Sequence, residues 1–202
     1  MLKIYGTSGS RTSRNLWLAE ELGLAYEHLP VAIRDVAGHP EITAINPARQ
    51  IPVIDDDGVV VAESMAINLY LVAKHGGPLA PRDAAETGHI AQWTFWVVTH
   101  VEALALTVLG HRVFFPADRR DPAKADEAEA ALARPLAVLE GALARGDGWL
   151  VGGRFTVADL NVAAIIAWLV ASRADLAAFP NVAAWVRRCR GRDAAKKAQK
   201  LP

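Results

Sequence analysis

The sequence predicts an α/β domain followed by a bundle of α-helices, and three observations carry this prediction. Short segments with strand-like patterning alternate with helical ones up to residue 77. The Asp57-Gly58 pair lies between two runs of β-branched residues, which is typical of a tight hairpin. Beyond residue 87 the long segments have the apolar spacing of helices and lack strand alternation. We therefore expect a βαβ-loop-ββα domain over residues 1–77, a linker over 78–87 and an all-helical domain over 88–202.

Glycine and proline residues mark the ends of the elements expected in the first domain. Gly6 ends the first alternating strand, and Gly23 is a favourable C-cap for the helix before it. Gly76-Gly77-Pro78 ends the last helix and opens the linker. In chain order we expect a strand over 2–5, a helix over 14–22, an extended segment over 26–33, a loop with at most a short helix over 34–50, strands over 51–54 and 59–62, and a helix over 64–74.

The second domain is expected to consist of long helices around one apolar helix. Thr156 is placed as a helix N-cap with Asp159 at the third helical position, which indicates a capping box. The residues at 160–170 are apolar on nearly every face, so this helix should be the buried axis of the bundle. The segments with helical periodicity are 89–115, 123–144, 156–172 and 180–190.

Composition and charge argue against several kinds of partner and site. Lys and Arg number 22 and Asp and Glu also 22, so no net charge favours nucleic acid or anionic lipid. The longest uncharged apolar stretch is shorter than the roughly 20 residues that span a bilayer. Cys189 is the single cysteine and no two histidines are spaced i, i+4, so neither disulfides nor metal sites are expected. We expect a cytoplasmic protein without membrane, nucleic-acid or metal partners.

The first candidate site is the hydroxyl-rich turn Thr7-Ser8-Gly9-Ser10-Arg11-Thr12-Ser13-Arg14 before the first helix. Free amides and the dipole at a helix N-terminus stabilise negative charge, and so lower the pKa of a bound thiol from its free value of about 8.5. A serine hydroxyl that donates to the sulfur adds to this stabilisation. The alternative is that these residues only cap the helix.

Two further candidate sites flank the hairpin. If the Ile51-Pro52 bond is cis, the turn presents the main-chain groups of Ile51 to an extended peptide; if it is trans, Pro52 is an ordinary edge-strand proline. Ser64 is expected to be the N-cap of the following helix. Ile67 stands where a capping box would have Glu or Gln. The hydroxyl and amides there either bind a ligand carboxylate or serve only to cap the helix.

Together these regions resemble the cytosolic glutathione S-transferase family, and the order and spacing of the motifs match along the whole chain. In the first domain the motifs are the hydroxyl turn with Asn15-Leu16-Trp17-Leu18-Ala19-Glu20-Glu21-Leu22-Gly23-Leu24, Asn46-Pro47-Ala48-Arg49-Gln50-Ile51-Pro52-Val53-Ile54, and Glu63-Ser64-Met65-Ala66-Ile67. In the second they are the segment from Phe155 to Leu160 and Phe179-Pro180-Asn181 leading to Trp185. The Ser10-Arg11 pair is similar to that of bacterial and fungal members. The resemblance implies a thioredoxin-like domain that binds glutathione, a helical substrate domain and a homodimer.

The resemblance also implies roles for individual residues in binding glutathione. Ser64 and Glu63 would hold the γ-glutamyl end, the Ile51 main chain beside Pro52 the cysteinyl unit, and Gln50 the glycyl end. The chain departs from the family pattern here, because many members have Gly-Lys where it has Arg49-Gln50.

Thiol activation is expected from the first turn and acceptor binding from the helical domain. Ser10 is the first candidate for activation and Ser8 the second, although Gly9 stands where a serine often activates the thiol. Arg11 either places positive charge near the sulfur or forms a surface ion pair or a dimer contact. Three further residues lie where the family lines its acceptor pocket, although an aromatic stripe is also typical of a core; they are Trp93, Trp96 and His100.

The expected activity is attack of the glutathione thiolate on a small hydrophobic electrophile, or reduction of a peroxide. The alternatives are a binding or scaffold protein with little activity, and a glutathione-dependent isomerase, dehalogenase or lyase. No cysteine precedes Cys189, which argues against disulfide reduction through a mixed glutathione adduct. Glutathione is the expected co-substrate, with no metal.

Overall fold

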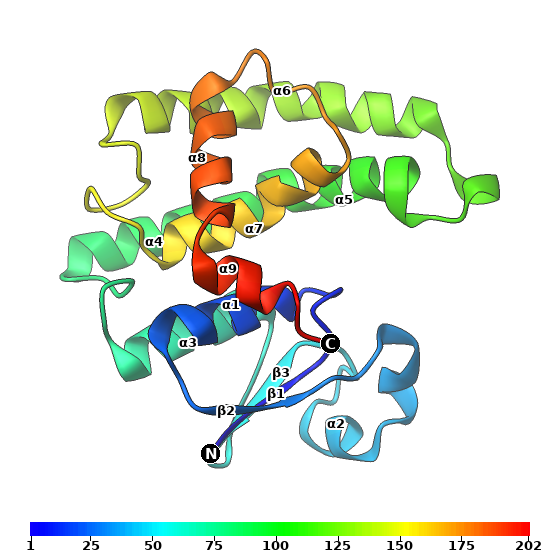
Figure 1. The fold of residues 1–202 in the computed structure, drawn as a ribbon, viewed down its shortest axis with the longest axis vertical. Helices are drawn as coiled ribbons and strands as arrows, with labels where there is room; N and C mark the ends of the chain where they lie inside the picture. Colours follow the sequence, from blue (N-terminus) through cyan, green and yellow to red (C-terminus); the bar gives the residue numbers. More distant parts are fainter. The chain divides into compact units, whose positions relative to one another are not determined.

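The computed structural model describes residues 1–202, which form two compact units (Figure 1). The first contains Met1–Ala80 and Gly191–Pro202, and the second contains Pro81–Arg190. The predicted α/β domain and all-helical domain are confirmed. The division differs from the predicted one, 1–77 and 88–202, in the last segment. Gly191–Pro202 packs on α1 (Ser13–Leu22) through the short helix α9 (Asp193–Ala198), and therefore belongs to the first unit.

A four-stranded mixed sheet organises the first unit. The strands, in the order β2-β1-β3-β4, are β2 (Tyr26–Leu29), β1 (Leu2–Tyr5), β3 (Val53–Asp56) and β4 (Val59–Ala62). β1 is parallel to β2 and antiparallel to β3, and β3 is antiparallel to β4. Tyr5 and Val53 are paired and pack with Ile42 in one core cluster. Because side chains alternate along a strand, the fully buried pair Ile4 and Ile54 faces the other side of the sheet.

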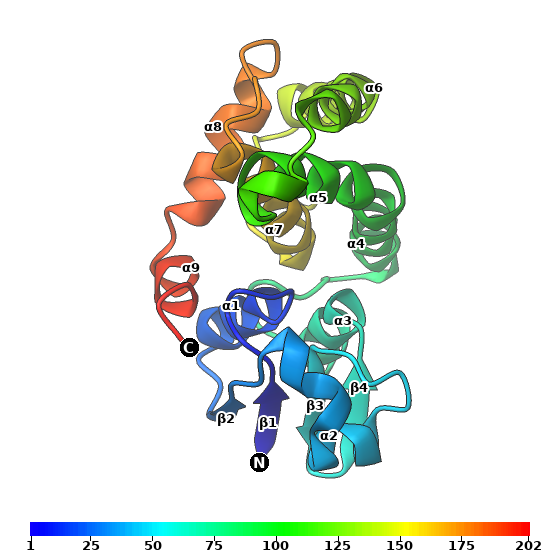
Figure 2. The same cartoon turned by 90° about the vertical axis from the view of Figure 1, so that its right-hand side faces the viewer.

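Helices cover both faces of this sheet. α1 and α3 (Ser64–His75) lie side by side, away from α2 (Pro40–Ile45), in both views (Figures 1 and 2). The loop expected over 34–50 contains two short helices, η1 (Ile33–Gly38) and α2, and β2 stops at Leu29. Pro40 is favourable as the first residue of α2, where a missing amide costs no hydrogen bond.

The predicted hairpin between β3 and β4 is confirmed. Asp57 and Gly58 have φ angles of 53° and 90°, the positive values that a tight hairpin turn requires. The Asp55 carboxylate accepts a hydrogen bond from the Gly58 amide at 2.8 Å. The turn therefore fixes the register that brings Val53 opposite Ala62.

The second unit is built around α7 (Val157–Ala171), which packs against α4, α5 and α8. The other elements are α4 (Ala84–Val97), η2 (Val98–Glu102), α5 (Ala103–Leu109), η3 (Gly110–Phe114), η4 (Ala117–Arg119), α6 (Pro122–Arg145) and α8 (Pro180–Arg190). The capping box is present, because Asp159 accepts from the Thr156 amide at 3.0 Å. α7 is buried along most of its length, so it is the predicted axis of the bundle.

The continuous helical stretch Ala84–Phe114 has the length and composition of a membrane-spanning helix, a property shared by core helices of globular proteins. Val97, Val101, Ala105 and Val108 along it are fully buried. Its α5 part packs on α6 and α7. This apolar face therefore contributes to the core of the second unit.

Candidate active site

The turn between β1 and α1 is closed by hydrogen bonds among its own residues. The Ser10 amide donates to the Thr7 carbonyl at 3.0 Å, and the Ser10 hydroxyl lies 2.7 Å from the same oxygen. The Ser10 oxygen accepts from the Thr12 amide at 3.2 Å. Ser13 donates its hydroxyl to the Ser10 carbonyl at 2.9 Å. Ser10 is half-buried, so its hydroxyl is partly accessible from outside the turn.

The amides at the start of α1 are already used, which corrects the expectation of free N–H groups there. The amides of Ser13, Arg14 and Asn15 donate to the carbonyls of Ser10, Arg11 and Thr12 at 3.1, 3.2 and 2.9 Å. These bonds form because the chain enters the helix through consecutive tight turns, which provide carbonyls at the spacing of the first amides. Side-chain hydroxyls are therefore the donors of this turn that can change partner.

Ser8 and Arg11 lie in different surroundings within the same turn. The Ser8 hydroxyl donates to the Leu201 carbonyl at 2.6 Å, and the Ser8 amide donates to the Pro202 oxygen at 2.9 Å. Arg11 is exposed. Of the two predicted thiol activators, only Ser10 has its hydroxyl bonded within the turn itself.

Gly6 brings the first turn and the Ile51-Pro52 turn together. Its φ angle is 121°, and a Cβ atom at this position would collide with Thr12 Oγ1 and lie 3.1 Å from Ile51 Cβ. The Ile51-Pro52 bond is cis, the isomer that the peptide-binding interpretation requires. Strand pairing begins at Val53, so Ile51 lies outside it. The absence of a side chain at Gly6 thus places Ile51 beside the hydroxyl turn.

Gln50 is exposed at the end of a turn that Asn46 organises. The Asn46 side chain donates to the Gln50 carbonyl at 2.9 Å and accepts from the Ala48 amide at 3.1 Å. Arg49 has a φ angle of 50°, in the left-handed region. A glycine adopts this conformation without strain, which explains the Gly-Lys pattern from which Arg49-Gln50 departs.

The start of α3 differs from the prediction, because its N-cap is Glu63 and not Ser64. Ser64 is the first helical residue, and its hydroxyl accepts from Arg14 Nη1 at 3.1 Å. Glu63 is exposed, has φ 71° and ψ 114°, and caps none of the amides with its side chain. The first amide with a main-chain acceptor is that of Ile67, which donates to Glu63 O at 2.9 Å. This helix start can therefore donate to an anion.

A buried polar network joins the starts of α1 and α3. Arg14 is 2 % exposed and Asn15 and Asn68 are fully buried. The Asn15 amide group donates to Ser64 O and to Asn68 Oδ1, both at 2.8 Å. The Asn68 side chain donates to Arg14 O at 3.4 Å. The guanidinium of Arg14 thus donates to the Ser64 hydroxyl from the buried side. Its positive charge favours a negatively charged group that approaches this hydroxyl from outside.

Tyr5, at the end of β1, has its phenol turned away from this role. Its hydroxyl donates to Glu41 at 3.0 Å, and the side chain packs in the α2 core cluster. Burial first, and then the bond to Glu41, raise the pKa of Tyr5 to about 12. The phenol therefore stays protonated and bonded to Glu41, and the remaining hydroxyl donors near this site are those of the turn.

The three residues predicted for the acceptor pocket form a cluster on α4 and η2. Trp93 and Trp96 are half-buried, with ring centroids 5.0 Å apart in an edge-to-face arrangement. His100 is exposed, and its ring centroid is 6.5 Å from that of Trp96. A core would bury both indoles completely, and an exposed stripe would leave both open to solvent. Their half-burial fits neither description.

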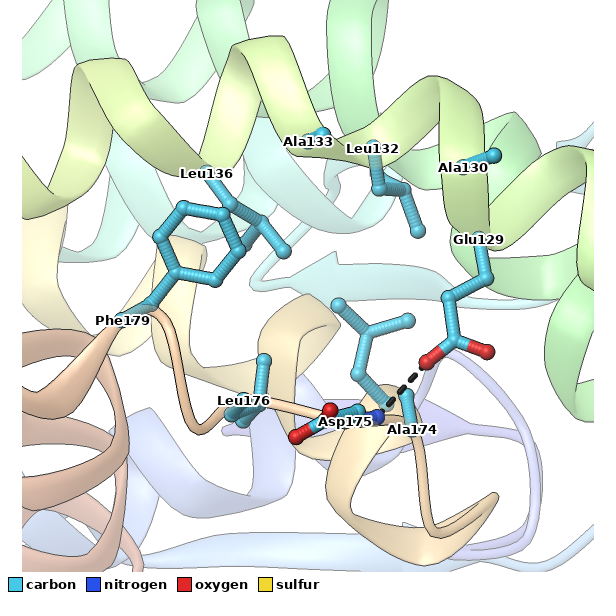
Figure 3. A pocket seen from close by; sticks show the side chains of 10 residues that line it. Glu129, Ala130, Leu132, Ala133, Leu136, Ala174, Asp175, Leu176 and Phe179 are labelled. Carbon is cyan, nitrogen blue, oxygen red and sulfur yellow. Dashed lines mark hydrogen bonds between the residues drawn. The ribbon is translucent and has the colours of Figure 1, made fainter.

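A separate cavity of about 210 Å³ lies between α6 and the segment that follows α7 (Figure 3). Apolar side chains line most of it, among them Leu132, Leu136 and Phe179. Two acidic residues lie on its wall, Glu129 and Asp175, and Glu129 accepts from the Asp175 amide at 2.6 Å and pairs with Arg112. The cavity contains none of the predicted site residues. No group of three metal-ligating side chains occurs in the structure.

Two family models match the chain, one in each unit. The glutathione S-transferase N-terminal domain matches residues 1–73, and the glutathione S-transferase C-terminal domain matches residues 103–193. The chain belongs to the glutathione S-transferase family. Glutathione S-transferase 4 of Zea mays is 32% identical over 210 residues, covering 100% of this chain and 93% of the relative. A glutathione S-transferase-like protein of Aspergillus terreus is 29% identical, covering 97% of this chain and 93% of the relative.

Solved structures of glutathione S-transferases have the same fold. The theta-class enzyme from Xanthomonas axonopodis pv. citri, solved with glutathione bound, has a TM-score of 0.89 at 28% identity. The aligned region covers 100% of this chain and 98% of the Xanthomonas chain. The resemblance first drawn from the hydroxyl turn, the Gln50-Ile51-Pro52 segment and Glu63-Ser64 is thus confirmed at the level of the family.

Sequence reasoning placed Arg14 in the first candidate turn without a role, and it missed Asn68 of the buried network altogether. Asn68 lies on a helix between the apolar residues Ile67 and Leu69. A polar residue on the buried side of a helix requires partners, because an unpaired buried polar group costs about 1–3 kcal/mol. This pattern was the available signal. The pattern indicates that the buried polar residue has polar partners, but it does not indicate which helix carries them.

Proposed function

We propose that the chain is a glutathione transferase which joins the glutathione thiolate to small hydrophobic electrophiles. The observation that carries the proposal is the contact between three predicted regions. Ile51 and Thr12 of the hydroxyl turn both lie close to Gly6, and the start of α3 is bonded through Ser64 to Arg14 and Asn15 of α1. Related structures were solved with glutathione or lactoylglutathione bound, which supports the same ligand here.

The proposed roles follow the chemistry of each helix start. Ser64 and the amides that follow it bind the γ-glutamyl carboxylate, supported by Arg14 behind the hydroxyl. Glu63 binds the γ-glutamyl ammonium, Ile51 pairs with the cysteinyl main chain, and Gln50 binds the glycyl end. Ser10 donates a hydrogen bond to the thiolate sulfur once its hydroxyl leaves Thr7 O.

The reaction needs no covalent enzyme intermediate. With an aryl chloride, the thiolate sulfur forms a bond to the ring carbon, and chloride leaves with the electron pair of the carbon–chlorine bond. The thiol proton passes to solvent when the thiolate forms. The enzyme contributes by ionising the thiol and by holding the two reactants together. Trp93, Trp96 and His100 are proposed to contact the apolar acceptor.

Peroxide reduction, homodimerisation and a cytoplasmic location complete the proposal. A peroxide is another electrophile for the same thiolate. A single cysteine, Cys189, suits a reducing compartment. Sedimentation of the purified protein tests the dimer, with a species of twice the chain mass expected and a monomer contradicting it.

Binding and turnover together test the function. The full chain should be retained on immobilised glutathione, released by free glutathione, and should conjugate an activated aryl chloride faster than the uncatalysed reaction. Retention without turnover across aryl halides, epoxides and peroxides would indicate a scaffold. Turnover of an isomerisable substrate without net loss of glutathione would indicate an isomerase.

A further inference from the structure

We propose that Ser8 is a positioning residue, which ties the C-terminal segment Gly191–Pro202 to the turn that holds Ser10. The inference rests on the proposed function, because it concerns how the thiol-activating hydroxyl is held. Both polar groups of Ser8 are engaged, the hydroxyl with Leu201 O at 2.6 Å and the amide with the Pro202 oxygen at 2.9 Å. The Ser8 hydroxyl bonds a residue outside the turn, so turning it toward a sulfur would break the link to the C-terminal segment. Ser8 therefore acts on the site indirectly, by holding the main chain of the turn in place.

The C-terminal segment is anchored along α1 at several points. At the last turn of α1, Arg192 donates through Nε and Nη2 to the Glu21 carboxylate at 2.6 and 2.7 Å. Lys197 Nζ lies 2.6 Å from Glu20 Oε2. Ala195 and Ala198 of α9 are 2 % and 1 % exposed. Figures 1 and 2 show α9 beside α1 and the chain end near the turn before it.

The contact with Ser8 acts on the conformation of the turn. Ser8 and Gly9 are the central residues of the turn that the Ser10 amide closes onto Thr7 O. Gly9 has no side-chain contact to limit its main chain, since a Cβ there would touch nothing within 4 Å. The bonds from Ser8 to Leu201 and Pro202 are therefore the links that fix this turn to another part of the unit.

A fixed turn keeps the Ser10 hydroxyl within hydrogen-bonding reach of the glutathione sulfur. With the main chain held, only the Ser10 side chain has to rotate away from Thr7 O. With the main chain loose, the hydroxyl spends part of its time out of reach, and ordering it again on binding costs conformational entropy. The pKa of the bound thiol should then move up, toward its free value of about 8.5. A variant with a loose turn should therefore react more slowly than the wild type at pH values below the thiol pKa, and at the same rate at pH values above it.

The test compares wild type, Ser8→Ala, a variant that stops after Lys200, and the double variant. The thiolate absorbance of bound glutathione is titrated against pH, and kcat and KM are measured with one aryl chloride. Each single change should raise the thiol pKa by about half a unit, which is about threefold less thiolate at low pH. KM for glutathione should stay within about twofold. The double variant should match the shortened chain, because loss of residues 201 and 202 already removes the carbonyl to which the Ser8 hydroxyl donates.

Two variants control for a general loss of structure. Ser8→Thr keeps a hydroxyl and should retain the wild-type thiol pKa. Lys197→Ala removes the ion pair between this exposed lysine and Glu20 but leaves residues 201 and 202, and should also leave the thiol pKa unchanged. If the shortened chain fails to fold, the Ser8→Ala and Ser8→Thr pair carries the test.

Several results would overturn the inference. An unchanged thiol pKa in Ser8→Ala, or a rate loss equal at all pH values, would give Ser8 no positioning role. Additive effects in the double variant would show that Ser8 and the C-terminal residues act separately. A wild-type protein with no thiolate absorbance would instead contradict the proposed function itself.

Discussion

The starts of α1 and α3 lie against each other but meet their hydrogen-bonding needs in opposite ways. At α1 the first amides donate to carbonyls of the preceding turn, and the Ser8 and Ser10 hydroxyls are bonded too. At α3 the N-cap Glu63 adopts a sparsely populated conformation and leaves the first amides uncapped. A satisfied start can contribute a rotating hydroxyl, whereas an uncapped start can bind a carboxylate directly. This difference supports the proposal that the thiol lies at the start of α1 and the γ-glutamyl end at the start of α3.

The two starts also differ in what they cost the folded protein. A non-glycine residue with the dihedral angles of Glu63 costs about 1–3 kcal/mol. The burial of Arg14 requires hydrogen bonds to offset its desolvation. The start of α1 has no comparable strain. Substitutions at Glu63 and in the buried Arg14 network should therefore change stability and binding together, whereas substitutions of the hydroxyls before α1 should change the chemistry.

The largest effect is expected at Arg14, which links the two starts. Arg14→Ala removes the donor to Ser64 and leaves a cavity under the site, so unfolding in urea should show a loss of about 2–4 kcal/mol. Retention on immobilised glutathione should be lost as well. Arg34→Ala is the control, because that side chain is 88% exposed and should change stability by less than about 0.5 kcal/mol. Equal effects of both variants would remove Arg14 from the site.

A large effect on chemistry alone is expected at Ser10. Ser10→Ala should raise the pKa of bound glutathione by about 1–2 units toward the free value, which is about 10- to 100-fold less thiolate below the wild-type pKa. The acidic limb of the pH–rate profile should move to higher pH, with the rate at high pH retained. Ser13→Ala removes a neighbouring hydroxyl that bonds only the Ser10 carbonyl, and should shift the limb far less. A larger shift from Ser13→Ala would reassign the activator.

A moderate effect of mixed sign is expected at Glu63. Glu63→Gly relieves the strained conformation and should stabilise the protein by about 1 kcal/mol. The same change removes the carboxylate and should raise the KM for glutathione about tenfold. Glu63→Ala separates the two contributions, since it loses the carboxylate but keeps the strain. If Glu63→Gly stabilises the protein with no change in KM, strain at this position is unrelated to glutathione.

The smallest effect is expected at Arg49, a second strained residue outside both helix starts. Its φ angle of 50° favours glycine, so Arg49→Gly should stabilise the protein by at most about 1 kcal/mol. The KM for glutathione should not change. A clear rise in KM would extend the site to Arg49 and weaken the contrast with Glu63.

The sequence predicted features that short-range chemistry determines. The Asp57-Gly58 hairpin, the Gly23 helix end and the Thr156–Asp159 capping box each depend on neighbouring residues, and each is present. The cis Ile51-Pro52 bond was one of two open alternatives, because a proline permits both isomers and the surrounding fold selects one.

Features that depend on distant contacts were not predicted. α9 has six residues, too few for a clear periodicity, and its place on α1 comes from partners about 170 positions away such as Arg192 and Glu21. Ser64 was expected to be an N-cap because serine favours that position, yet Arg14 supplies the bond that its oxygen accepts. In both cases tertiary contacts override a local preference.

A crystal structure of the full chain with glutathione bound tests the central claim most directly. We predict the γ-glutamyl carboxylate within hydrogen-bond reach of the Ser64 hydroxyl and the first amides of α3. We also predict the sulfur within reach of the Ser10 hydroxyl, with Ser8 still bonded to Leu201. Glutathione bound away from both helix starts, or a sulfur with no hydroxyl of the first turn beside it, would contradict the account.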